Sequence, residues 1–189
     1  ETRLRVLQVS LKGSGDGCRA DGVLCQRANG TVETIAAGKV VMCAGAINSP
    51  QLLMLSGVGD AEALQAVGIT PRVHLPGVGA NLQDHLEVYV QQACTQPVSL
   101  APALRWYRQI PIGIEWYLKQ TGAGASNHFE AGGFVRSGAD AGWPDVQFHF
   151  LPIAMSYDGT MAHRGHGYQL HAGPMKPTSR GAVTLASVD

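Results

Sequence analysis

Apolar residues alternate with polar ones, or run together, in several short stretches of the first 45 residues. Residues 4–12 (LRVLQVSLK) alternate in part and predict a strand. The stretches VLCQR and TVETI flank Asn29-Gly30, a pair typical of a tight hairpin. The apolar run KVVMC at residues 39–43 predicts a buried parallel strand. We therefore expect a β-meander that leads into one more strand ahead of Gly45.

The stretch GAINSPQLLMLSGVG, residues 45–59, combines small residues at both ends with a dense apolar centre. Asn48 or Ser49 can cap a helix and Pro50 suits a first helical position, so we expect a tight turn and then a short helix. Gly57 marks the end of that helix. Such a junction is where ligands dock in a nucleotide-binding sheet, but it is equally typical of an ordinary strand–helix corner.

The rest of the chain predicts short helices first and then mainly strands. Asp60 and Gly68 are the expected cap and stop of a short helix, and residues 112–122 (IGIEWYLKQTG) predict another. The stretch LEVYVQQAC predicts a strand or an extended crossing segment. Four later stretches predict the strands of an antiparallel sheet: HFEAGGFVRS, PDVQFHFLP, YQLHAGPM and GAVTLASVD. A loop is expected from Ala154 to Gly167. The predicted fold class is α+β.

Composition narrows the class of protein. The 189 residues are 45% hydrophobic and 15% charged, which argues against disorder. The formal net charge is zero and Lys and Arg do not cluster, so nucleic acid is a poor partner. No apolar run approaches the roughly 18 residues of a membrane span. Four cysteines without a CxxC pair favour reduced thiols and a cytoplasmic location, while membrane association stays open.

Most familiar catalytic motifs are missing from this sequence. No G-x-G-x-x-G occurs, and the three nearest stretches, GSGDGC, GVGANL and GAGASN, fail at the last position. No G-x-S-x-G marks a serine nucleophile. His163 and His166 lie three residues apart without a nearby carboxylate, which favours a surface loop over a metal site. We therefore expect no metal.

Three polar residues of the second half stand out from their surroundings. Glu130 lies in an apolar, glycine-rich stretch, where a buried carboxylate needs a cation or hydrogen-bond donors. It is either a solvated edge residue paired with Arg136 or a carboxylate held for a cationic ligand. His149 and His171 fall on the polar faces of predicted strands, and such histidines lie at the surface or line a covered pocket.

The stretch GAINSPQLLMLSGVG, residues 45–59, resembles a signature of the glucose–methanol–choline (GMC) flavoprotein oxidoreductases. Ten positions match that signature without a gap: Gly45, Ala46, Ser49, Pro50, Leu52, Leu53, Ser56, Gly57, Val58 and Gly59. The stretch LPGVGANLQDHLE resembles another loop of the family, and three further stretches resemble choline dehydrogenases in particular: GASNHFEAGGFVRS, PDVQFHFLP and SRGAVTL. The resemblance runs over essentially the whole chain.

The resemblance implies part of an FAD-binding domain of the glutathione-reductase type in residues 1–93. It implies part of a substrate domain with an antiparallel sheet in residues 94–189. Ala44 and Gly45 would contact the FAD, because small residues let the backbone approach a dinucleotide. The loop with Asn81, Asp84 and His85 would pass near the flavin. Family members are roughly three times longer, so we expect a central fragment that is inactive alone and holds no catalytic residue.

For the substrate, the resemblance implies choline or a similar small alcohol, oxidised to betaine aldehyde by hydride transfer to FAD. Glu130 falls where related enzymes place the carboxylate that binds the ammonium group, and His149 falls where they keep a substrate-positioning histidine. Met155 lies where some relatives have a pocket aromatic. A GMC enzyme for a neutral alcohol and a non-catalytic module of the same fold remain as alternatives. The electron acceptor and the oligomeric state stay open.

Overall fold

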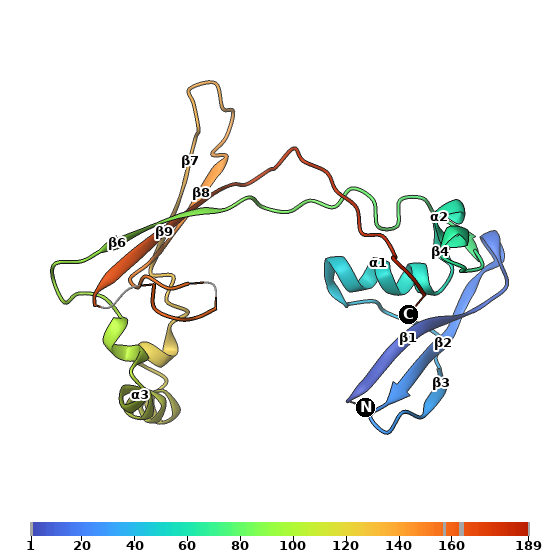
Figure 1. The fold of residues 1–189 in the computed structure, drawn as a ribbon, viewed down its shortest axis with the longest axis horizontal. Coiled ribbons are helices and arrows are strands. Elements are labelled where there is room, and N and C mark those ends of the chain that lie inside the picture. The colour runs from blue at the N-terminus through green and yellow to red at the C-terminus, as the bar shows by residue number, and fades with distance from the viewer. Residues whose placement is uncertain (1, 157, 163–164, 189) are drawn as a thin grey trace. The chain divides into compact units, whose positions relative to one another are not determined.

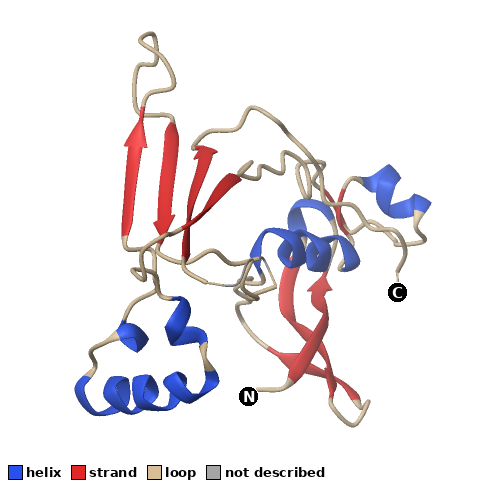
Figure 2. Cartoon of the chain, turned by 60° about the vertical axis from the view of Figure 1, so that its left-hand side comes forward, coloured by secondary structure: helices blue, strands red, loops and turns tan. Residues whose placement is uncertain are grey.

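The chain forms two compact units in a computed structural model that describes residues 2–156, 158–162 and 165–188. The first unit comprises Glu1–Gln83 with Ser179–Asp189, and the second comprises Asp84–Thr178. Each unit has its own antiparallel sheet and its own helices (Figure 1). This mixture of helices and antiparallel sheets confirms the predicted α+β class (Figure 2).

The sheet of the first unit is the expected β-meander. β1 (Leu4–Lys12), β2 (Arg19–Arg27) and β3 (Val32–Ala36) pair antiparallel in that order, with a short 3-10 helix η1 (Gly15–Gly17) ahead of β2. The side-chain carbonyl of Asn29 accepts a hydrogen bond from the backbone N–H of Thr31 (3.0 Å) and helps to close the turn between β2 and β3. The prediction of a hairpin at Asn29-Gly30 is confirmed.

Two helices and a small parallel pair of strands follow in the first unit. They are α1 (Gly45–Leu55), β4 (Val58–Gly59), α2 (Ala61–Ala66) and β5 (Val73–His74), with β4 and β5 paired. The Asp60 carboxylate accepts the N–H of Ala63 (2.9 Å) and caps α2, as predicted. Gly57 ends α1 in a left-handed conformation (φ 84°), and a Cβ there would lie only 2.7 Å from the Thr70 carbonyl oxygen.

Two predictions around this helix were wrong. Residues 39–43 form no strand, and Val41 is 74% exposed, because the backbone of this segment pairs with none of the described strands. Helix α1 begins at Gly45 rather than at Pro50, which lies inside it. The turn is made by Gly45 itself, and the Ser49 hydroxyl accepts the N–H of Ala44 (3.1 Å) from within the first turns.

The first unit is held together by a small apolar core and one buried hydroxyl. Its buried apolar residues are Val9, Cys25, Met54, Val58 and Leu64. The Ser56 hydroxyl donates to the carbonyl of Leu52 (2.6 Å) and accepts the N–H of Val9 (2.8 Å). Ser56 is only 8% exposed, so this side chain joins the end of α1 to the middle of β1 away from water.

The second unit carries a four-stranded antiparallel sheet in the order β6-β9-β8-β7. Its elements are β6 (Val88–Ala93), η2 (Ala101–Leu104), α3 (Trp106–Lys119), η3 (Ala123–Ala125), β7 (Ala131–Val135), β8 (Val146–Leu151) and β9 (Gly167–Pro174). The hydroxyl and the N–H of Ser137 both donate to the Asp145 carboxylate between β7 and β8 and lower the pKa of that carboxyl group.

The ends of the second unit differ from the predicted ones. The chain changes unit after Gln83 rather than at residue 93, because β6 pairs with β9 along its whole length. The predicted strand GAVTLASVD was wrong, since its described residues 181–188 form no strand of this sheet. Gly181 instead exchanges two backbone hydrogen bonds with Leu82 (2.8 and 2.9 Å), which returns the last residues to the first unit. Which unit binds a cofactor and which binds a substrate stays a prediction.

The buried hydroxyl of Ser56 gives a stability test of the first unit. Ser56→Ala leaves the Val9 N–H without its partner in a buried place, so the free energy of unfolding should fall by about 1–3 kcal/mol. Urea unfolding of the chain measures this change. Ser14→Ala, at an exposed serine whose side chain makes no capping hydrogen bond, is the matched control and should change little. Equal unfolding midpoints for the two variants would contradict the role given to Ser56.

Candidate functional site

The first candidate site is the corner between residue 43 and α1. Gly45 has φ +85°, a conformation that favours glycine, and a Cβ built there would meet no atom within 4 Å. Ala44 precedes it and is exposed. Packing among the described residues therefore does not explain why both positions are small. Open space over a backbone turn at a helix N-terminus fits the close approach of a ligand, which is the contact expected of Ala44 and Gly45.

A groove of about 1030 Å³ lies in the first unit beside this corner. Its walls are the strands β1 and β2, residues 40–44, the exposed side of α1 and the returning residues Leu185, Ser187 and Val188. Among the described residues that line the groove, Arg5 is the one Lys or Arg. The groove therefore offers mostly apolar and backbone groups, which suit a flat ring or a sugar better than a phosphate.

The loop predicted to pass near a flavin is irregular and exposed. Asn81 has a left-handed backbone (φ 59°), which asparagine tolerates better than most residues. The Asp84 carboxylate accepts the N–H of His85 (2.9 Å) and thereby shapes its own turn. The chain changes unit between Asn81 and Asp84, and these three residues keep their cofactor role only as a prediction.

The second candidate site is one face of the sheet in the second unit. Residues directly opposite each other in antiparallel strands share a face. The pairing places His149 of β8 opposite His171 of β9, and His171 opposite Tyr89 of β6. The rings of Tyr89 and His171 stack with centroids 5.3 Å apart. The next row of this face holds Gln91 and Gln169, so polar side chains occupy its centre.

Glu130 lies just before β7 and next to an aromatic contact of this face. The ring of Phe129 meets His149 edge-on, with centroids 5.6 Å apart. The Glu130 carboxylate is exposed and accepts a hydrogen bond from the Ser126 hydroxyl (2.9 Å). Among the described residues it has no ion pair, and its predicted alternative partner Arg136 is not bonded to it. A carboxylate without an ion pair, in a residue adjacent to an aromatic contact, is a candidate to receive an organic cation.

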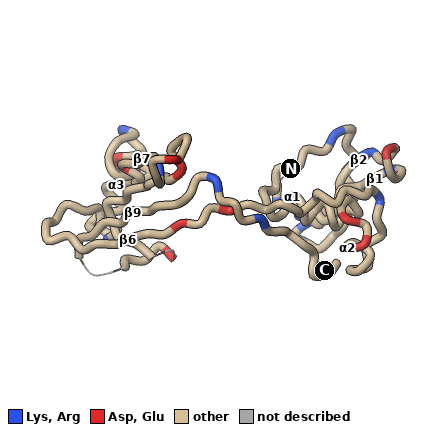
Figure 3. The backbone as a smooth tube through the Cα atoms, turned by 90° about the horizontal axis from the view of Figure 1, so that it is seen from above, with Lys and Arg blue, Asp and Glu red and all other residues tan. Residues whose placement is uncertain are grey.

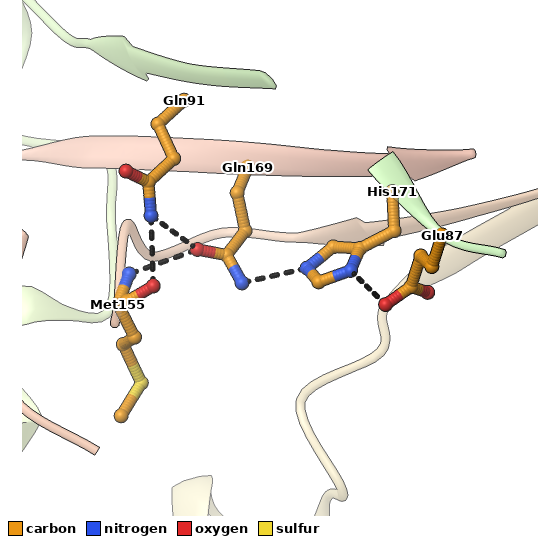
Figure 4. Close-up of polar contacts among 5 residues, drawn as sticks. All are labelled: Glu87, Gln91, Met155, Gln169 and His171. Atoms are coloured by element: carbon orange, nitrogen blue, oxygen red, sulfur yellow. Dashed lines mark hydrogen bonds and ion pairs between the residues drawn. The ribbon is translucent and has the colours of Figure 1, made fainter. Parts of the chain in front are cut away.

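Met155 is tied to the same face through its backbone. Its N–H donates to the side-chain oxygen of Gln169 (2.9 Å), and its carbonyl accepts from the side-chain amide of Gln91 (2.7 Å) (Figure 4). The structure therefore brings Met155 and His149 to one face of the sheet, and Phe129, which precedes Glu130 in the sequence, contacts His149. Glu87, Gln91 and Gln169 were not predicted as site residues; the polar alternation of YQLHA, in which His171 stood out, would also have indicated Gln169.

Other kinds of site find little support in the part of the chain that the structure describes. It contains no group of three His, Cys, Asp or Glu residues placed to hold a metal ion, and His163 lies outside the described residues. Lys and Arg are spread along both units rather than gathered in one patch (Figure 3). None of the described helices combines the length and the apolar character needed to cross a membrane.

Solved structures share this fold. Pyridoxine 4-oxidase from Mesorbium loti matches with a TM-score of 0.72 and 26% sequence identity, over 98% of this chain and 32% of that chain. A formate oxidase matches with a TM-score of 0.85 and 22% identity, over 98% of this chain and 37% of that chain. The second likeness, at its low identity, concerns the fold alone.

Sequence comparisons give higher identities. Oxygen-dependent choline dehydrogenase of Staphylococcus xylosus is 52% identical over 189 residues, which is 100% of this chain and 33% of the relative. The protein of the same name in Staphylococcus aureus strain Newman is also 52% identical, with 32% of its length covered. The chain thus spans about a third of the length of the curated relatives that it matches. The family model described as GMC oxidoreductase matches residues 1–87 of this chain.

Proposed function

We propose that this chain is the central part of an FAD-dependent choline dehydrogenase. The observation that carries the proposal is Glu130: its exposed carboxylate has no ion pair among the described residues, and the residue directly follows Phe129, whose ring meets His149 edge-on. The trimethylammonium group of choline offers no N–H donor, so a protein recognises it with negative charge and aromatic faces. The curated relatives carry the same activity in their names and support this proposal.

The roles proposed for the chain's residues follow from their places. Glu130 attracts the cationic end of choline, His149 donates or accepts a hydrogen bond at the polar end, and the backbone around Met155 supplies a wall. Ala44 and Gly45 fit the close approach of FAD at the corner of the first unit, and Asn81, Asp84 and His85 are proposed to lie along its path. When bound, FAD accepts the hydride that leaves the alcohol carbon. The base that takes the hydroxyl proton is expected outside these 189 residues.

The wider setting belongs to the same proposal. The relatives' name points to oxygen as the electron acceptor and to choline as the substrate, and oxidation of choline would place the enzyme in glycine betaine biosynthesis. The four cysteines are free in the structure, which supports a cytoplasmic location. A GMC enzyme for a neutral alcohol is the main alternative. Glu130 discriminates between the two, because a neutral-alcohol enzyme would gain nothing from a carboxylate there.

The first test concerns the charge of Glu130 in the full-length enzyme. An ion pair at about 4 Å is worth on the order of 1 kcal/mol in water-like surroundings and about 4 kcal/mol at an effective dielectric constant near 20. Glu130→Gln keeps the shape and removes the charge, so KM for choline should rise roughly tenfold or more. The uncharged analogue 3,3-dimethylbutanol should be oxidised as well as before.

Steady-state kinetics with both substrates measure this difference. Glu62→Gln, at an exposed carboxylate of α2 in the other unit, is the matched control and should leave both substrates unchanged. If Glu130→Gln leaves choline kinetics intact, or impairs both substrates equally, Glu130 does not bind the ammonium group and the neutral-alcohol alternative gains.

A second test concerns the cofactor. The sequence lacks the glycine-rich fingerprint that binds the phosphates of a dinucleotide, and Arg5 is the one Lys or Arg among the described residues that line the groove beside Gly45. Because few groups are left to bind the phosphates, the 189-residue chain should hold FAD only weakly. We expect the purified chain to be colourless and FAD titration to show no tight binding. Absorbance near the flavin bands and isothermal titration calorimetry check this. A yellow preparation with stoichiometric flavin would refute the expectation.

A further inference from the structure

Side chains of the sheet bond to both the N–H and the carbonyl group of Met155. Gln169 of β9 accepts its N–H, Gln91 of β6 donates to its carbonyl, and the two glutamines are bonded to each other (2.9 Å) (Figure 4). Gln169 is only 5% exposed, so these bonds form away from water. Two long-range side chains thus fix the position of one residue in the connection between β8 and β9.

The donor at Met155 determines which way the Gln169 amide points. A backbone N–H can only donate, so the Gln169 atom that faces it must be the oxygen. The NH2 group of Gln169 then faces Nε2 of His171 at 2.7 Å. Because an amide NH2 group only donates, Nε2 of His171 must accept and cannot carry a proton.

The same reasoning reaches Glu87. With Nε2 unprotonated, the proton of His171 is on Nδ1 and is donated to the Glu87 carboxylate at 2.9 Å. His171 is 8% exposed, which makes an unmatched N–H or lone pair costly. An imidazolium paired with Glu87 would direct a second N–H at the NH2 group of Gln169. The hydrogen bonds therefore fit a neutral His171 in one tautomer.

We propose that Gln169 and His171 are positioning residues for the substrate wall at Met155. Gln169 holds the Met155 backbone, and neutral His171 locks the Gln169 amide in the orientation that this requires. The proposal rests on the proposed function for the role of Met155 as a wall. Besides Glu87, the groups that face His171 are Tyr89, which stacks on its ring, and His149, which lies opposite it in β8.

Gln169→Leu in the full-length enzyme tests the hold on Met155. It removes the acceptor, so the Met155 amide should exchange its hydrogen about tenfold faster, as followed by hydrogen-exchange mass spectrometry of the peptide that carries it. KM should rise for choline and for 3,3-dimethylbutanol alike, because a displaced wall affects shape rather than charge. Gln92→Leu makes the same change on the other face of β6 and should alter neither readout. Unchanged exchange in Gln169→Leu would overturn the proposal.

Two conservative variants test the protonation state of His171. In Glu87→Gln an amide oxygen still accepts the Nδ1 proton, so exchange at Met155 should stay within about twofold of the original. If exchange instead rises about tenfold, His171 is a cation that needs the charge of Glu87, and the proposed lock is wrong.

Gln169→Glu keeps an acceptor for Met155 but puts its second oxygen against Nε2 of His171. The lone pair of Nε2 then faces an acceptor instead of a donor, so the new carboxylate should be repelled from His171 and exchange at Met155 should be faster than in the original enzyme. If exchange at Met155 is the same in both, the assigned tautomer is wrong. Exchange needs no turnover, so these outcomes are independent of whether choline is the substrate. Failure of the proposed function would appear in the Glu130→Gln kinetics instead.

Discussion

A backbone N–H can donate a hydrogen bond but never accept one, and at Met155 this restriction organises the polar face of the second unit. It sets the orientation of the Gln169 amide, which in turn requires an acceptor at Nε2 of His171 and leaves the proton on Nδ1. Glu87 completes the series at its more exposed end. Buried polar groups of this kind stabilise a structure only when every donor meets an acceptor. A substitution that removes one hydrogen-bonding group of the series therefore leaves the hydrogen-bonding group of its neighbour without a partner.

The first unit uses the same principle on a smaller scale. One hydroxyl, that of Ser56, accepts from β1 and donates to α1, which lets a strand and a helix end meet without an unpaired backbone group. In both units buried or half-buried polar side chains connect segments that lie far apart in the sequence. The apolar cores are modest, and such polar connections specify which segments pack together.

Local features of the fold could be predicted from the sequence, and features that depend on a distant partner could not. The turn at Asn29-Gly30 and the cap at Asp60 act within a few residues, so their chemistry is visible in a short window. Residues 39–43 have the composition of a strand, but a strand also needs a neighbour, and none of the described strands provides one. The change of unit also depends on a distant partner. It lies after Gln83 and not at residue 93, because β6 pairs with β9, which comes much later in the chain.

The candidate site also has parts that short stretches of sequence predict and parts that depend on residues far apart in the chain. The GMC-like signature is contiguous, so the corner at Gly45 could be proposed as a cofactor contact from residue types alone, and that role stays a prediction. Gln91 and Gln169 are 78 residues apart in the sequence, and nothing in either stretch announces that they meet. Only the register of β6 against β9 brings them together beneath Met155.

On the proposed function, charge and shape place different demands on the protein. The attraction between a carboxylate and a trimethylammonium group has no preferred direction and declines slowly with distance, so Glu130 can act from an exposed position with one hydrogen bond from Ser126. Repulsion between atoms in contact changes steeply over a few tenths of an ångström, so a wall must be held rigidly. This difference explains why the structure places one hydrogen bond on Glu130 but holds Met155 with two glutamines and a buried histidine behind them.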